Sequence, residues 1–131
     1  MADAVLVESR FHDASVLVAE LDRAGKSPDL AVWYYFDEFD DWRLMIASSQ
    51  LDTLVPKQMS LAFRSIGDAI AASGVHSLSI SDVKLVRNDD PLPKAIRICI
   101  RTDTLSLVRA HFTSTTVNGI FIKEMIVLRA A

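Results

Sequence analysis

Residues 31–49 of this chain read AVWYYFDEFDDWRLMIASS. Both tryptophans, both tyrosines and two of the six phenylalanines fall between Trp33 and Trp42. Two apolar runs flank a group of four acidic residues, which is typical of a β-hairpin with buried strands and a charged turn. The sequence therefore predicts one strand over residues 31–36 and a second over residues 42–48.

The first of these strands is bulky on both faces. Because side chains alternate along a strand, Trp33 and Tyr35 lie on one face. Tyr34 and Phe36 lie on the other. Such a strand either belongs to a sheet that is covered on both sides or contributes to an oligomer interface. Trp33, Tyr35 and Trp42 are therefore interface candidates, and with the high apolar content of a 131-residue chain they predict a homodimer.

Helical patterns lie on either side of this hairpin. No glycine or proline interrupts residues 2–24, and apolar residues recur there every three or four positions, which predicts one long helix. The alternative is a strand over residues 5–7, followed by a helix that starts at an Asp13 cap. The clearest helix is predicted over residues 56–73, because proline opens it, Gly74 follows it and its apolar residues keep helical spacing.

Residues 77–86 alternate polar with apolar side chains, as a half-buried strand does. Leu78 and Ile80 nevertheless have the opposite parity to Val83 and Leu85. A β-bulge near residues 81–82 would restore a single apolar face, and a turn between two strands is the other possibility.

Residues 91–101 are compatible with two structures. Asp90 before Pro91 is a good helix N-cap followed by a proline in the first turn, and Leu92 and Ile96 share a helical face. Isoleucines that alternate with other residues from position 96 onward would suit a strand instead. The capping signal favours the helix.

Residues 109–128 contain the strongest turn signal of the chain. Asn118-Gly119 separates two strand-like runs, over residues 109–117 and 120–128, and both turn residues accept a positive φ. The whole pattern predicts a single α+β domain over residues 1–131. Its mixed or antiparallel sheet of four to six strands would consist of two hairpins and one further strand, packed by two or three helices.

Bulk composition indicates a globular intracellular protein. Half of the residues are hydrophobic and the mean hydropathy is +0.25, but no apolar run approaches the roughly 18 residues of a membrane-spanning helix. The first residues lack a secretory signal pattern. Cys99 is the single cysteine, so no intrachain disulfide is expected and a cytoplasmic location fits best.

The order of these segments resembles small bacterial proteins that carry no assigned activity. The resemblance covers nearly the whole chain and lies in Trp-Arg-Leu-Met-Ile-Ala-Ser at 42–48, Asn-Asp-Asp-Pro-Leu at 88–92 and Val-Asn-Gly-Ile-Phe-Ile-Lys-Glu at 117–124. It implies a bacterial source and favours the helix at 91–101, and it brings no catalytic residues with it.

The acidic turn offers one kind of chemistry. Asp37, Asp40 and Asp41, with Glu38, supply the oxygen ligands that Ca²⁺ or Mg²⁺ accepts. A metal there would activate water, which makes a metal-dependent hydrolase the alternative function. The spacing is not that of a calcium-binding loop, and a solvated turn would carry the same residues.

Basic residues offer a second kind. Lys94, Arg97 and Arg101 share one face if residues 91–101 are helical, and Lys84 and Arg87 lie nearby in sequence. Together they predict an anion-binding or nucleic-acid-binding surface. A net charge of −3 and the lack of interleaved aromatic residues disfavour nucleic acid.

No other polar residues stand at the spacing of a known motif. The three histidines are far apart and match no zinc site, Cys99 lacks a nucleophile signature, and no glycine-rich phosphate loop occurs. This pattern favours a non-enzymatic module that binds itself or another protein, with no cofactor.

Overall fold

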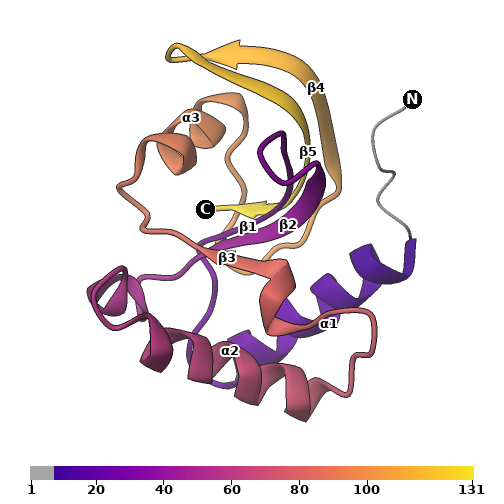
Figure 1. Ribbon diagram of the computed structural model, residues 1–131, viewed down its shortest axis with the longest axis vertical. Helices are drawn as coiled ribbons and strands as arrows, with labels where there is room; N and C mark the ends of the chain where they lie inside the picture. The colour runs from indigo at the N-terminus through magenta and orange to yellow at the C-terminus, as the bar shows by residue number, and fades with distance from the viewer. Residues whose placement is uncertain (1–7) are drawn as a thin grey trace.

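The computed structural model describes residues 8–131 and contains a five-stranded mixed sheet with helices on both faces (Figure 1). The helices are α1 (Glu8–Arg23), α2 (Met59–Ser73) and α3 (Pro91–Cys99). The strands are β1 (Leu30–Phe36), β2 (Asp41–Ala47), β3 (Val83–Leu85), β4 (Ala110–Val117) and β5 (Ile120–Ala130). Their order is β3-β2-β1-β5-β4, with only the β2–β3 pair parallel. The predicted α+β class, with two hairpins and one further strand, is confirmed.

The aromatic strand β1 lies in the middle of the sheet, and every one of its residues is buried. Trp33 and Tyr35 pack on the side of α1 and α2, whereas Tyr34 and Phe36 pack on the side of α3. Figure 1 shows α1 and α2 together on one side and the β4–β5 hairpin curving over α3 on the other. Both faces of β1 are therefore covered by the same chain.

Helix α1 buries one apolar stripe against the sheet. Its buried residues keep the predicted spacing of three or four positions: Phe11, Ala14, Leu17, Val18 and Leu21. Asp13 lies inside α1, so the shorter helix capped at Asp13 is wrong; its carboxylate instead accepts hydrogen bonds from the Ser77 amide and hydroxyl. The start of the predicted long helix and the alternative strand over residues 5–7 lie outside the described residues.

Helix α2 begins three residues later than predicted. A short 3₁₀ helix, η1 (Asp52–Leu54), precedes it, and Gln58 still has a non-helical backbone with φ −125° and ψ 52°. Pro56 therefore lies in the connection rather than in the first helical turn. Gly74, with φ 72°, ends the helix as predicted and donates its N–H to the Ile70 carbonyl.

The alternation of polar and apolar residues before β3 is interrupted by a turn. The 3₁₀ helix η2 (Ile80–Asp82) rotates the chain, so Ile80 faces solvent whereas Val83 and Leu85 are buried. Ser79 and Asp82 close this turn as a capping box. The predicted ten-residue strand is therefore wrong, and the strand is limited to β3.

Residues 91–99 are helical, and the strand alternative is wrong. Ile96 is fully buried while Ile98 is 59% exposed, as expected from two residues on opposite sides of a helix. Asp90 occupies the N-cap position, but its carboxylate accepts the Arg87 N–H instead of a helix amide. The second hairpin also forms as predicted, with φ of 52° at Asn118 and 75° at Gly119.

One buried ion pair joins α1 to β5, and no sequence pattern predicted it. Arg129 of β5 is fully buried, and its guanidinium donates to both carboxylate oxygens of Asp22 at 2.9 and 3.0 Å. Its other N–H groups donate to the carbonyls of Pro28, Leu105 and Ser106. All five guanidinium donors are used. Burial alone would raise the pKa of Asp22, but hydrogen bonds from Arg129 and Ser27 and the charge of Arg129 lower it.

Replacing Arg129 by methionine should lower the free energy of unfolding by about 3–5 kcal/mol, because Asp22 and three carbonyls lose their donors. Urea unfolding followed by circular dichroism measures this change. Arg64→Met, an exposed arginine of α2 with no ion pair in residues 8–131, is the control and should shift stability by less than about 0.5 kcal/mol. Equal losses in the two variants would contradict the role given to Arg129.

Candidate functional site

The aromatic residues predicted at an interface lie inside the molecule. Trp33 and Trp42 are 0% and 1% exposed, and Tyr35 is also buried. Helices α1 and α2 cover this face of the sheet, and the Arg10 guanidinium lies 4.8 Å from the centre of the Trp33 ring. In the described structure these three side chains therefore present almost no surface to a partner.

The three aspartates of the acidic turn have separate partners. Asp37 pairs with Lys123 at 3.2 Å, Asp40 accepts a hydrogen bond from the Tyr35 hydroxyl, and Asp41 pairs with the guanidinium of Arg43 at 3.1 Å. Within residues 8–131 no three His, Cys, Asp or Glu side chains lie close enough together to hold a metal ion. The geometry thus lends no support to the metal site predicted at Asp37, Asp40 and Asp41.

The predicted basic face is also divided. Arg97 turns inward and donates to the backbone oxygen of Ala131 at 2.7 Å and to the side-chain oxygen of Asn88 at 2.6 Å. Burial, followed by repulsion from Arg101, lowers the pKa of Arg97. Of the three residues proposed from α3 and its end, only Lys94 and Arg101 are exposed.

Arg87 and Asn88 belong to the same internal network. Arg87 donates to the carbonyls of Asp52 and Val55, and the Asn88 amide donates to the carboxylates of Asp29 and Asp52. These bonds hold η1 and the chain before β1 against the entry to α3. The donors and acceptors of this network are hydrogen-bonded to one another, which indicates a structural role.

A pocket of about 280 Å³ opens where β1 and β5 separate. Pairing between the two strands stops at Tyr34 and Met125, and the chain beyond each of them forms the walls. The lining residues come from the end of β1, the β1–β2 turn, α3 and β5: Tyr34, Tyr35, Phe36, Asp37, Glu38, Leu92, Phe121 and Lys123. We call this the acidic aromatic pocket.

Aromatic rings form most of its apolar wall. The rings of Tyr34 and Phe36 lie side by side with centroids 4.7 Å apart. Phe121 of β5 adds a third ring that is 56% exposed, and Leu92 of α3 completes the wall. An exposed phenylalanine at the mouth of a pocket is available to a ligand.

The electrostatic environment of the pocket is negative. Asp37 and Glu38 are exposed, and Glu38 has no hydrogen bond or ion pair with any of residues 8–131. The pKa of Tyr34 is raised, first by burial and then by the charges of Glu38 and Asp37. The negative charges of both carboxylates therefore disfavour ionisation of the Tyr34 phenol.

Two cations of the chain already lie at rings of this wall, Lys84 at 5.7 Å from the centroid of Phe36 and Lys123 at the Tyr35 ring. The Lys123 ammonium is 3.2 Å from an Asp37 carboxylate oxygen and 5.1 Å from the centroid of the Tyr35 ring. This is the arrangement in which aromatic rings and carboxylates stabilise an organic cation. The walls therefore have the chemistry to hold a positive group.

Sequence reasoning missed this pocket because its halves are distant in the chain. Lys123 and Asp37 are 86 positions apart, and no local motif connects them. Figure 1 shows the β1–β2 turn projecting beneath the curved β4–β5 hairpin, which brings the two segments together. The one signal available was the Asp37-Glu38 pair directly after an aromatic strand.

Comparison of the chain with models of protein families, with curated proteins and with solved structures gave no match. Roles for the lining residues are therefore taken from the geometry of this chain. Within residues 8–131, no helix combines the length and the apolar character needed to cross a membrane.

Glu38→Gln should lower the pKa of Tyr34, because it removes a negative charge that disfavours the tyrosinate form. The absorbance of tyrosinate against pH measures this in a Tyr35→Phe background, where Tyr34 is the only tyrosine. Asp68→Asn, which removes an exposed carboxylate of α2 that does not line the pocket, should leave the pKa of Tyr34 unchanged. If the two variants titrate alike, Glu38 does not face the phenol.

Proposed function

We propose that the protein is a binding module that takes a cationic side chain of a partner polypeptide, lysine or arginine, into the acidic aromatic pocket. The observation that carries the proposal is the convergence of the Tyr34, Phe36 and Phe121 rings with the Asp37 and Glu38 carboxylates around one cavity. Neither a neutral nor an anionic group would use both features of this lining.

Elementary electrostatics supports a cationic ligand. A cation over an aromatic face gains about 0.5–1 kcal/mol when exposed and about 2 kcal/mol when desolvated. The lining residues include two carboxylates and one ammonium, and the Lys84 ammonium lies 5.7 Å from the centroid of the Phe36 ring. Glu38 is the carboxylate left for a ligand, since Lys123 pairs with Asp37.

The size and position of the pocket support a side chain of a polypeptide over a larger free molecule. Its volume of about 280 Å³ is at the lower end of the roughly 300–1,000 Å³ of pockets for drug-sized ligands. Phe121 is paired with Thr116 of β4, whose outer edge has no neighbouring strand within residues 8–131. An extended partner chain can lie along such an edge through backbone hydrogen bonds.

The peptide Ac-Ala-Lys-Ala-NH₂ should bind at this pocket, and the same peptide with norleucine, which lacks the ammonium, should not. An amide NMR titration should show shifts at residues 34–38 and 120–123. Phe121→Ala should weaken binding of the lysine peptide about two- to thirtyfold, because one ring of the cation site is lost.

The matched control for this variant is Ile98→Ala, an exposed apolar residue outside the pocket. It should leave the affinity unchanged. Equal binding of the lysine and norleucine peptides, or shifts confined to other parts of the sheet, would refute the proposal.

The proposal includes self-association as a homodimer. The strand that is bulky on both faces no longer argues for it, because its own chain covers both faces. The support that remains is the outer edge of β4, eight residues long, on which a second copy could pair. Ser114, with φ 48°, interrupts this edge and limits the length of such pairing.

Light scattering at micromolar concentration should therefore give twice the 14.5 kDa mass of one chain. A single species with the mass of one chain over the whole concentration range would remove the dimer and leave the pocket proposal intact.

A further inference from the structure

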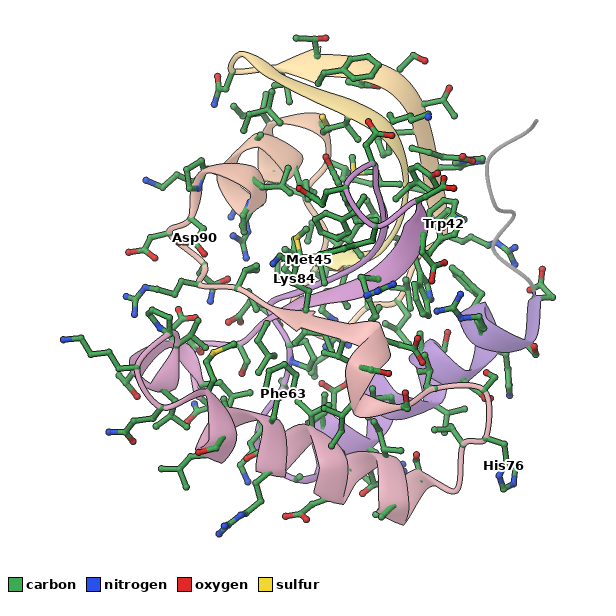
Figure 2. The ribbon with its side chains drawn as sticks, in the orientation of Figure 1. Trp42, Met45, Phe63, His76, Lys84 and Asp90 are labelled. Atoms are coloured by element: carbon green, nitrogen blue, oxygen red, sulfur yellow. The ribbon has the colours of Figure 1, made fainter. Side chains whose placement is uncertain are left out.

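A second cavity, of about 240 Å³, lies around the outer edge of β3 and beside the β1–β2 turn. Its apolar floor consists of Met59 and Phe63 from α2 and of Val83 and Leu85 from β3. Figure 2 shows Phe63 on the α2 side of β3 and Lys84 on the opposite side, so the cavity wraps around this edge. We call it the edge cavity.

The polar groups of the edge cavity are both cations. Arg43 and Lys84 line it, and none of its lining residues is acidic. Arg43 is held in place by the Asp41 carboxylate at 3.1 Å and lies 4.8 Å from the centroid of the Phe39 ring. Lys84 is exposed and has no carboxylate partner within residues 8–131, and its ammonium lies 5.7 Å from the centroid of the Phe36 ring.

We propose that the edge cavity binds a small free carboxylate with a linear apolar tail. The tail lies on Met59, Phe63, Val83 and Leu85, and the carboxylate meets the Lys84 ammonium. An apolar floor selects against fully polar anions, and the two cations select against amines. The volume, below the roughly 300–1,000 Å³ of pockets for drug-sized ligands, restricts the tail to a short chain.

This inference does not depend on the proposed function. Phe39 lines the edge cavity, whereas Asp37 and Glu38 line the acidic aromatic pocket, and no residue lines both. The charged lining residues are mainly acidic in the acidic aromatic pocket and only basic in the edge cavity, and Lys84 of the edge cavity lies 5.7 Å from the centroid of the Phe36 ring.

Hexanoate is the probe, and amide NMR titration is the measurement. We expect shifts at residues 59–63 and 83–85, with tighter binding of hexanoate than of 1-hexanol, hexylammonium or acetate. Lys84→Gln should weaken hexanoate about two- to fivefold, as expected for an exposed charge pair, and should leave 1-hexanol unchanged. Lys94→Gln, which removes an equally exposed lysine of α3, should leave both ligands unchanged.

Two results would overturn the proposal. One is binding of hexylammonium or 1-hexanol as tight as that of hexanoate, which would remove the role of the cations. The other is an affinity for N-acetylalanylleucine equal to or above that for hexanoate, which would assign the cavity to the carboxyl end of a polypeptide instead of a free acid. Because Lys84 is exposed, its substitution does not disturb the fold, and a folded spectrum of Lys84→Gln verifies this.

Discussion

The buried guanidinium of Arg129 is the constraint on which the rest of the structure depends. A buried charge is tolerated only when it is paired and its donors are satisfied. Here the acceptors come from the end of α1, the chain before β1 and the connection before β4. These segments must all be in place before the charge of β5 can be buried. Arg129 therefore couples a helix on one face of the sheet to the chain that leads into the edge hairpin.

The two cavities form where strand pairing ends. Helices cover β1 along its length, but its pairing with β5 ends at Tyr34. The acidic aromatic pocket opens beyond this point, and the edge cavity opens at the outer edge of β3. Phe36 of the first cavity contacts Phe39 of the second, with ring centroids 5.6 Å apart. The β1–β2 turn thus separates a negative cavity from a positive one.

The parts of the fold that sequence predicted are those fixed by local chemistry. Asn118-Gly119 has a backbone preference that selects a tight hairpin, and Pro91 after a capping residue selects a helix start. Errors arose where distant groups intervene. The parity break before β3 is resolved by a 3₁₀ turn, and the start of α2 is displaced by η1.

The candidate site was less predictable for the same reason. Asp37 was identified from the turn, but its partner Lys123 comes from the last strand, and neither position carries a motif. Helical spacing places Arg97 on one face of the helix with Lys94 and Arg101, which predicts a basic surface. The spacing does not show whether other parts of the chain cover that face. The Arg97 guanidinium turns inward because the oxygens of Asn88 and Ala131 lie within reach there. Such pairings become visible only once the fold brings the segments together.

Lys123 determines how a cation can enter the acidic aromatic pocket. Its ammonium already meets Asp37 and the Tyr35 ring, so a ligand either uses the remaining groups or displaces it. Both side chains of the Lys123–Asp37 pair are partly solvated, and exposed ion pairs contribute about 0–1 kcal/mol. Glu38 and the exposed Phe121 ring are available without any such exchange, whereas the Phe36 ring is buried and already faces the Lys84 ammonium. A cationic ligand of the proposed kind that first engages Glu38 and then competes for Asp37 would gain both carboxylates.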